Sequence, residues 1–235
     1  MLCKIADLYV EIPEAGGMAP RCREYKTNEK LPADIIIREE HYKTERYPHA
    51  TYDQVAYLFS GAQFYYHLLR FNGMMLHASA IEVDGKAYLF SGPSGVGKST
   101  HTGLWKQMLG EGARIFNDDK PALRYMDGVW YAYGTPWCGK DGININMKVP
   151  VAGICFLKRG EENSIRRLTK QEASFSVVAQ TVRRFRNEEL LDRMLALVEQ
   201  LTGDIPIYEL TNRPELEAAR LSFETMRRGA KEANL

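Results

Sequence analysis

The pattern of apolar and polar positions changes along the chain, which indicates a mixture of strands and helices. Residues 5–12 alternate weakly, and residues 33–37 form a second β-rich run after several prolines and glycines, so we predict strands and loops over the first 48 residues. Between residues 52 and 71 the apolar positions recur at intervals of three and four, which predicts a helix. The residues with this spacing are Val55, Leu58, Phe59, Ala62, Tyr66 and Leu69.

The middle of the chain predicts a hairpin. Residues 78–83 and 86–90 are β-rich and are separated by Asp84-Gly85, a pair that supplies the positive φ angles of a two-residue turn. A helix is predicted at 102–109, and a strand at 113–116. Further strands are expected at 122–125, 129–133, 151–157 and 205–210, and helices at 170–181 and 187–201. A closing helix starts near Pro214, whose ring suits a first helical turn.

These elements predict an α/β fold in which a mixed sheet with many antiparallel neighbours is flanked by helices. No repeat, low-complexity tract or Pro/Gly/Ser-rich linker divides the sequence. We therefore expect a single compact domain over residues 1–235. Within it, residues 1–75 would form an amino-terminal β-rich lobe plus a helix, and residues 76–235 a core.

Composition excludes several classes of protein. The 235 residues include 31 Lys+Arg and 30 Asp+Glu, so a net charge of +1 gives no overall field to attract nucleic acid or an anionic membrane. With 45% hydrophobic and 11% aromatic residues, the chain is not expected to be disordered.

The amino terminus, the longest apolar stretch and the cysteines indicate the cellular location we expect for the protein and the state of its thiols. The amino terminus has no signal-peptide pattern, and the longest apolar stretch, residues 149–157, is broken by Pro150 and Gly153. It is far shorter than the roughly 20 residues that span a bilayer. The four cysteines share no close spacing, so we expect free thiols in a reducing compartment and a cytoplasmic protein.

One motif carries the strongest chemical signal. Gly92-Pro93-Ser94-Gly95-Val96-Gly97-Lys98-Ser99, followed by Thr100, fits the Walker A phosphate loop (P-loop) G-x-x-x-x-G-K-[ST]. Its glycines let backbone N–H groups surround a phosphate, and the helix that follows directs its positive end at the same charge. Lys98 is expected to reach the β- and γ-phosphates, and the Ser99 hydroxyl to ligate Mg²⁺. Nucleotide binding is therefore predicted.

Paired aspartates follow about 20 residues later, at the end of a short apolar run. Asp118 and Asp119 suit a division of labour in which one supports Mg²⁺ and the other accepts a proton from an attacking hydroxyl. An Asn-Asp-Asp turn at a strand end is the structural alternative.

Other candidates are weaker. His77 opens the hairpin strand that leads to the loop, so it is expected to orient an aspartate or contact a phosphate, although a packed histidine is the alternative. His101 is expected to be packed. In residues 134–142, Trp137 and Lys140 are candidates to close over the substrate and to add charge, and a plain hairpin connection is equally compatible with the sequence. Further cations available to a γ-phosphate are Arg159, Arg183, Arg184 and Arg186.

From LHASAIEVDGKAYLFSGPSGVGKST through RIFNDD, the sequence resembles the catalytic domain of the HPr kinase/phosphorylase family. That family is itself similar to phosphoenolpyruvate carboxykinases in its nucleotide-binding core. The resemblance implies an α/β kinase core that uses ATP and Mg²⁺ to phosphorylate a hydroxyl. By motif position it assigns roles to His77, Lys98, Ser99, Asp118 and Asp119. After the Asp pair this chain has GTPWCGKDGININMKVPVAG instead of the family's glycine-rich signature, so the resemblance does not extend to the acceptor or to phosphorylase activity.

Sequence and resemblance together predict a phosphotransferase: an ATP-dependent kinase of a serine-like hydroxyl on a peptide, protein or small molecule. Lys98, His77, Asp118 and Asp119 would be catalytic, and Ser99 with the aspartates would support the metal. The alternatives are a non-catalytic nucleotide-binding regulatory module and an ATP hydrolase. The sequence identifies neither the acceptor nor the oligomeric state.

Overall fold

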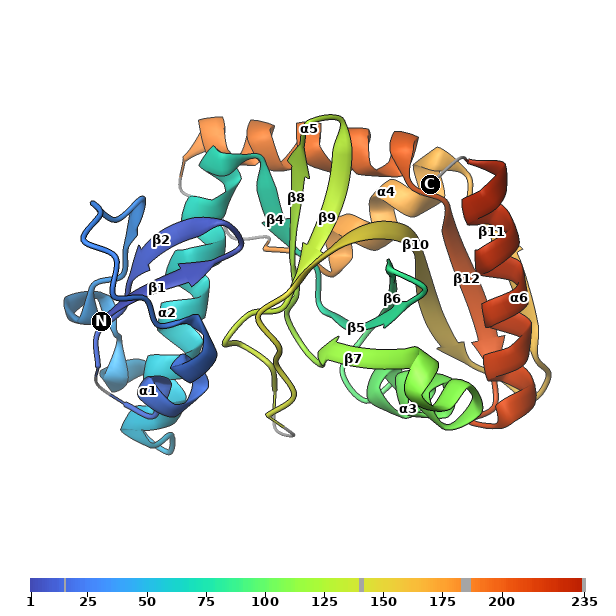
Figure 1. Ribbon diagram of the computed structural model, residues 1–235, viewed down its shortest axis with the longest axis horizontal. Coiled ribbons are helices and arrows are strands. Elements are labelled where there is room, and N and C mark those ends of the chain that lie inside the picture. Colours follow the sequence, from blue (N-terminus) through green and yellow to red (C-terminus); the bar gives the residue numbers. More distant parts are fainter. Residues whose placement is uncertain (15, 140–141, 183–186, 234–235) are drawn as a thin grey trace.

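In the computed structural model, which describes residues 1–14, 16–139, 142–182 and 187–233, two β-sheets are flanked by helices (Figure 1). The small sheet holds β1 (Leu2–Ile5), β2 (Leu8–Glu11) and β3 (Ile35–Ile36). The large mixed sheet curls around the centre of the molecule. Its strands are β4 (Gly73–Met75), β5 (Ala78–Val83), β6 (Lys86–Ser91), β7 (Ala113–Asn117), β8 (Ala122–Met126), β9 (Val129–Tyr133), β10 (Lys148–Arg159), β11 (Ser164–Arg167) and β12 (Ile207–Asn212). The chain is thus mixed α/β, as predicted.

The α-helices are α1 (Met18–Arg21), α2 (Tyr52–Leu68), α3 (Lys98–Leu109), α4 (Lys170–Ala179), α5 (Glu188–Asp204) and α6 (Leu216–Glu232). Short 3-10 turns lie at Arg23–Tyr25, Glu39–His41, Thr44–Arg46, Leu69–Phe71 and Gly110–Gly112.

β10 is the strand that joins the two halves of the large sheet. Its first residues pair antiparallel with β9, and further along it pairs parallel with β6 on one side and β12 on the other. Because β10 has partners along both edges and helices over both faces, eight of its twelve residues are buried, including all of 151–157. A strand buried on both faces is expected to be a continuous apolar run, which residues 151–157 are.

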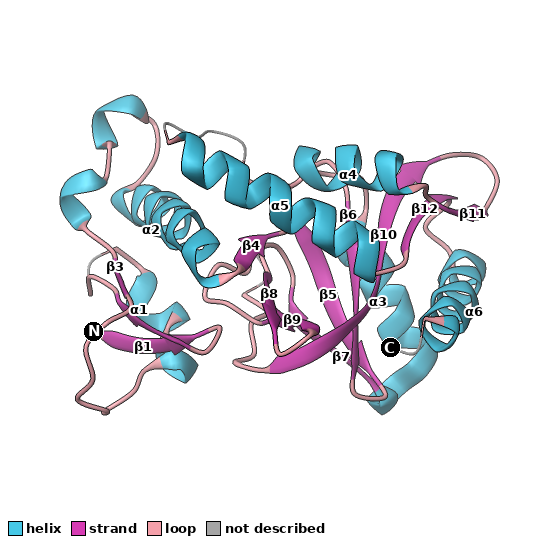
Figure 2. Ribbon diagram, turned by 90° about the horizontal axis from the view of Figure 1, so that it is seen from above, coloured by secondary structure: helices cyan, strands magenta, loops and turns pink. Residues whose placement is uncertain are grey.

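The two faces of the central strands bury different helices. In β6, Leu89 contacts the apolar cluster that contains α4 and α5, whereas Phe90 belongs to the cluster with Trp105 of α3 and Met226 of α6. This alternation follows the two-residue period of a strand. Figure 2 shows α4 and α5 along one face of the sheet, with α3 and α6 displaced to the other side.

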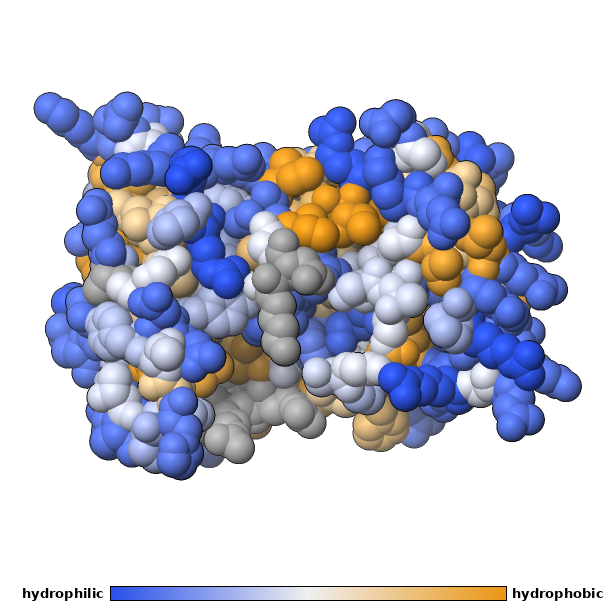
Figure 3. Space-filling model, turned by 90° about the horizontal axis from the view of Figure 1, so that it is seen from below, coloured by the Kyte–Doolittle hydropathy of each residue, from blue (hydrophilic) through white to orange (hydrophobic). Residues whose placement is uncertain are grey.

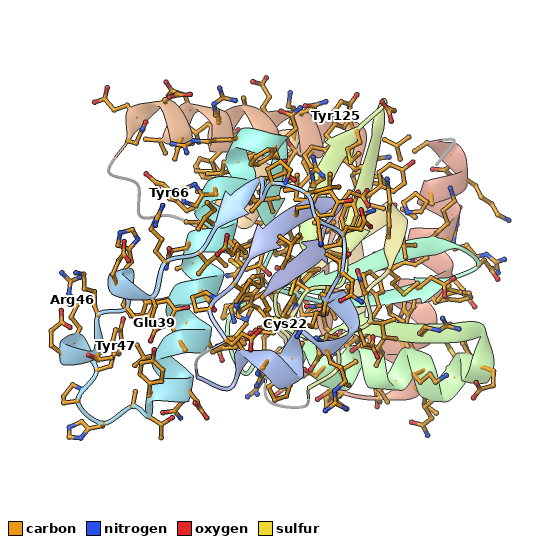
Figure 4. All side chains as sticks on the ribbon, turned by 60° about the vertical axis from the view of Figure 1, so that its left-hand side comes forward. Cys22, Glu39, Arg46, Tyr47, Tyr66 and Tyr125 are labelled. Atoms are coloured by element: carbon orange, nitrogen blue, oxygen red, sulfur yellow. The ribbon has the colours of Figure 1, made fainter. Side chains whose placement is uncertain are left out.

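The amino-terminal region packs as a separate apolar cluster around α2. The weakly alternating run at residues 5–12 is not one strand, because Ala6 and Asp7 have φ of 52° and 59° and form the turn between β1 and β2. Cys22 lies in the interior of this region, while Glu39, Arg46 and Tyr47 lie at its outer edge (Figure 4). All four cysteines, which are free and buried, agree with the expected thiols.

Most predicted elements are present. The helix at 52–71 is α2 with a 3-10 turn at its end, and the hairpin is β5–β6, with Asp84 and Gly85 at φ of 52° and 73°. The closing helix differs from the prediction: Glu215 is its N-cap, so Pro214 precedes the helix instead of entering its first turn. The sequence pattern did not predict β4 or β11.

Hydrophilic residues surround the face of the molecule drawn in Figure 3, and the apolar residues there form separate areas between them. Among the described residues, no helix is both long enough and apolar enough to cross a bilayer.

Candidate functional site

Strand directions bring three distant segments to one edge of the large sheet. β5 pairs antiparallel with both β6 and β7, so the start of β5 lies beside the ends of the other two strands. In register, Ala78 faces Ser91 of β6, and Ala80 faces Asn117 of β7. His77, the loop from Gly92 to Ser99 and the pair Asp118-Asp119 therefore meet at this edge.

The Gly92–Ser99 loop has a backbone that favours glycine. Gly92, Gly95 and Gly97 have φ of 142°, 79° and 111°, values that residues with a Cβ rarely adopt. Gly97 is the N-cap of α3, so the loop leads directly into the positive end of that helix. The loop is closed by the Lys98 ammonium, whose Nζ donates to the carbonyl oxygens of Gly92 at 3.1 Å and Pro93 at 3.3 Å.

A cavity of about 450 Å³, here called the loop cavity, lies beside this loop. It is lined by His77, Ser94, Gly95, Gly97, Lys98, Ser99, Thr100, Asp118, Asp119 and Gly139. All residues predicted to be catalytic or metal-supporting thus face one space. The remaining loop residues, Gly92, Pro93 and Val96, line a different cavity on the β10 side of the loop.

The two aspartates have different surroundings. The Asp118 carboxylate is buried and accepts a hydrogen bond from the Ser79 hydroxyl at 2.6 Å. Ser79 is itself 2.8 Å from the Thr102 hydroxyl of α3. Asp118 is therefore held between the hairpin and the helix that follows the loop.

Asp119 lies within a network of hydrogen bonds and one ion pair with a lysine. His77 Nε2 is 3.2 Å from Asp119 Oδ1, Lys120 Nζ forms an ion pair with Oδ2, and the Tyr57 hydroxyl donates to Oδ2 at 3.2 Å. Burial alone would raise the pKa of Asp119, but the hydrogen bond from His77 and the charge of Lys120 outweigh it and lower the pKa to about 2. Asp119 is thus a carboxylate throughout the neutral range.

The pKa values of the two lysines at the site, Lys98 and Lys120, shift in opposite directions. Burial lowers the pKa of the Lys98 ammonium, and the charges of Asp119 and Asp118 only partly counter it. For Lys120 burial also acts to lower the pKa, but its contact with Asp119 raises the pKa above the usual value. His77 is oriented from its other side, because Nδ1 lies 3.2 Å from the Gln180 amide oxygen at the end of α4.

Two further cavities adjoin the loop cavity. The first, of about 520 Å³ and called the Arg21 cavity, shares Asp119 and Gly139 with it and is otherwise lined by Gly17, Arg21, Asp53, Gln54 and Tyr57. The second, of about 440 Å³ and called the Arg159 cavity, shares Gly95, Gly97 and Thr100. Its other residues include Arg159 and Asn212, the last residues of β10 and β12, and Arg213, which follows β12. The loop cavity therefore lies between the other two.

Sequence reasoning missed Arg21, Tyr57 and Lys120. Lys120 follows the Asp pair directly, so its position was a usable signal. Arg21 and Tyr57 come from α1 and α2, and no local pattern connects them to residues that lie so far along the chain.

Trp137 does not close over the loop cavity. Its side chain is fully buried, stacks on Phe64 with ring centroids 4.8 Å apart, and donates from Nε1 to the Ser60 hydroxyl at 3.0 Å. Trp137 thus anchors its segment to α2. Its neighbour in the prediction, Lys140, lies outside the described residues, as do Arg183, Arg184 and Arg186.

The packed interpretation of His101 is confirmed. Its ring is buried, and Nε2 is 2.9 Å from the Ser222 hydroxyl of α6. Burial lowers the pKa of His101 to about 4. Arg159, another cation noted in the sequence, donates from Nη2 to the Gly95 carbonyl at 2.6 Å and so contacts the loop.

The donor set beside the loop suits a hard cation. The Ser99 hydroxyl and the carboxylates of Asp118 and Asp119 line the same cavity, and oxygen atoms are the ligands that Mg²⁺ prefers. In the part of the chain that the structure describes, no cluster of three or more His, Cys, Asp or Glu side chains could hold a metal. Magnesium in nucleotide sites is commonly bound by one or two carboxylates together with phosphate oxygens.

Comparison with protein families gives a match over residues 53–212 to the family described as SynChlorMet cassette protein ScmC, which is more than half of the chain. The chain belongs to the ScmC family. The part that matches the ScmC family contains Tyr57, His77, the Gly92–Ser99 loop and the Asp pair, whereas Arg21 precedes it.

No curated protein matches the sequence of this ScmC-family chain. Among solved structures, the HPr(Ser) kinase/phosphatase from Coxiella burnetii is similar with 15% sequence identity and a TM-score of 0.29, over 55% of this chain and 92% of that one. A TM-score this low supports no conclusion about fold or function.

Proposed function

We propose that this ScmC-family protein is an ATP-dependent kinase that transfers the γ-phosphate to a serine-like hydroxyl. The observation that carries the proposal is the shared lining of the loop cavity. A glycine-rich loop with its lysine and serine, two aspartates and a histidine come from three separate segments and face one space. A turn without chemical function would not require this convergence.

The three adjoining cavities suggest how the substrates lie. The triphosphate occupies the loop cavity, with the backbone N–H groups of the loop and the positive end of α3 around it. The nucleoside extends into the Arg159 cavity. The acceptor approaches from the opposite side, where Asp119 faces both the loop cavity and the Arg21 cavity.

Each side chain then has a role that its surroundings favour. Lys98 neutralises charge on the β- and γ-phosphates once its ammonium turns from the loop carbonyls to phosphate oxygens. Ser99 and Asp118 would hold Mg²⁺, which offsets the developing charge on the phosphates when it is bound. Asp118 lines the loop cavity and not the Arg21 cavity, which suits this role.

Asp119 orients the acceptor hydroxyl and takes its proton. Its low pKa makes it a weak base, which fits a loose transition state in which the proton leaves late and positioning matters more than base strength. His77, Lys120 and Tyr57 fix the carboxylate for this task. Because the two aspartates line one cavity but only Asp119 lines both, we assign base work to Asp119 and metal support to Asp118.

The test is turnover of γ-labelled ATP with Mg²⁺ against a panel of serine and threonine peptides and cell metabolites, read by a mass shift of the acceptor. Asp119→Asn is expected to lower the transfer rate by about 100-fold or more while ATP still binds. Asp192→Asn, an exposed change on α5, is the matched control and is expected to leave the rate unchanged.

The two alternatives give different results in the same assay. ATP binding without turnover, with or without acceptors, would identify a regulatory nucleotide-binding module. Release of inorganic phosphate at a rate that no acceptor changes would identify an ATP hydrolase. Transfer at the wild-type rate by both Asp118→Asn and Asp119→Asn would refute the roles given to the pair.

A further inference from the structure

The Tyr57 side chain lines the Arg21 cavity and contacts two charged residues of its wall, Arg21 and Asp119. The Arg21 guanidinium stacks on the Tyr57 ring, with its central carbon 4.8 Å from the ring centroid. The Tyr57 hydroxyl donates a hydrogen bond to Asp119 Oδ2 at 3.2 Å and accepts one from the Gly139 N–H at 3.1 Å. A fixed cation over the ring face and a fixed carboxylate at the hydroxyl thus contact the same tyrosine side chain.

Arg21 is held in place at this cavity by contacts that leave its charge uncompensated. Nη1 donates to the Gly139 carbonyl at 3.2 Å and to Cys138 Sγ at 3.3 Å, both of them uncharged acceptors. No carboxylate among the described residues lies within 4.0 Å of the guanidinium. A planar guanidinium that is positioned by stacking retains further N–H donors in a fork that matches a carboxylate.

Charge then sets the orientation of a ligand in this cavity. A carboxylate is attracted to Arg21 and repelled by Asp119 and by Asp53, which also lines the cavity, so it would lie against Arg21. A hydroxyl on the same molecule would lie against Asp119, beside the loop cavity. The two groups would be separated by about the distance from the face of the Tyr57 ring to its hydroxyl, which is the scale of one or two amino-acid residues.

We propose that the Arg21 cavity is the acceptor site and that it selects hydroxyl compounds that carry a nearby carboxylate, through Arg21. This inference rests on the proposed kinase function and adds the chemical class of its substrate. The carboxylate can come from a free hydroxy amino acid or from a peptide, and both sources share this chemistry. In the transfer, the acceptor oxygen forms the new bond to phosphorus, the bond to the ADP oxygen breaks, and the hydroxyl proton goes to Asp119.

The first experiment compares acceptors in pairs that differ only in the carboxylate. Serine is paired with serinamide, and the amidated tripeptide Ala-Ser-Asp with amidated Ala-Ser-Asn. In the wild-type protein, kcat/KM for transfer is expected to be at least about tenfold higher for the carboxylate member of the pair that is used. The pair that shows transfer distinguishes a free amino acid from a peptide.

Variants of Arg21 then test the residue. Arg21→Gln is expected to remove the preference by lowering kcat/KM for the carboxylate acceptor about tenfold or more, with kcat/KM for the amide and KM for ATP unchanged. Arg21→Lys keeps the charge but not the planar fork, so it is expected to restore the preference only in part. Arg23→Gln, an exposed change just beyond α1, is the matched control.

Binding separates failure of this inference from failure of the proposed function. Calorimetry with the same acceptors, in the presence of a non-hydrolysable ATP analogue, measures the carboxylate preference without turnover. Carboxylate-selective binding that Arg21→Gln abolishes, but with no transfer, would support the site and refute the kinase. Transfer or binding that is equal for both members of each pair, or insensitive to Arg21→Gln, would overturn the inference, as would failure of every carboxylate acceptor to bind.

Discussion

The neighbours of Asp119 predict how the stability of the protein depends on pH. The pKa of this carboxyl falls from its ordinary value of 3.8 to about 2 in the folded protein, because His77 and Lys120 outweigh the opposing effect of burial. A carboxyl with a lowered folded-state pKa contributes stability above its unfolded-state pKa and loses that contribution as the pH falls through the folded-state value. At about 1.4 kcal/mol for each pKa unit, the full contribution is about 2 kcal/mol.

The measurement is urea unfolding of the wild type and Asp119→Asn, followed by circular dichroism at pH 6, 4.5 and 3. The side chain of Asp119 is only 20% exposed, so solvent screening removes little of the effect. Relative to pH 6, the difference in unfolding free energy between the two proteins is expected to shift by about 1 kcal/mol at pH 3, against the wild type. Most of this shift should occur below pH 4.5.

The same comparison in a His77→Gln background tests the cause. Removing the hydrogen bond from His77 is expected to reduce the shift, because that contact is the largest of the effects that lower the pKa of Asp119. A difference that stays constant from pH 6 to pH 3 in the wild-type background would refute the reasoning. An undiminished shift without His77 would refute the assigned cause and leave Lys120 as the remaining one.

Three stability predictions follow from packing and backbone geometry, each measured by urea unfolding. Trp137→Phe is expected to cost about 2 kcal/mol, since it leaves a cavity beside Phe64 and removes the donor to Ser60; a neutral change would mean that the indole is not packed. Ser222→Ala should cost about 2 kcal/mol, because the Trp105 indole N–H, 2.9 Å from the Ser222 hydroxyl, loses its acceptor; no loss would indicate that water replaces it. Gly95→Ala should lower the free energy of unfolding by about 1 kcal/mol, because Gly95 has a φ of 79°, and should weaken ATP binding. Gly103→Ala in α3, where an added Cβ meets nothing, should instead raise the free energy of unfolding. Equal changes in the two variants would refute the argument from the positive φ of Gly95.

The elements that the sequence predicted well are those with strong local signals. The apolar spacing in α2, the Asp84-Gly85 turn and the glycine-rich loop can each be recognised within a single segment of the chain. The turn at Ala6-Asp7 was missed because Ala6 is not a turn former, no glycine accompanies Asp7, and the flanking strands are short. β4 and β11 are stabilised by pairing with distant strands and not by their own composition.

The residues of the candidate site also divide into those that a local motif predicts and those that only tertiary structure brings together. Lys98, Ser99, Asp118 and Asp119 belong to short motifs, so the sequence alone could predict them as members of one candidate site. The partners of Asp119 depend on tertiary structure: Tyr57 comes from α2, and the cavity beyond it is completed by Arg21 from α1. The role of Trp137 was left open between two alternatives, since an aromatic residue in a glycine-rich segment has no local feature that distinguishes a lid from a core anchor.

The position of β10 has a consequence for how the nascent chain folds. Its partner β6 is synthesised earlier, but its other partner, β12, leaves the ribosome only after residues 160–206 have been made. Until then the edge at residues 154–159, which includes Ile154, Cys155 and Phe156, has no strand to pair with and is open to association with other chains. Synthesis that stops before β12 would therefore yield an aggregation-prone chain, even though every motif of the candidate site would already be present in it.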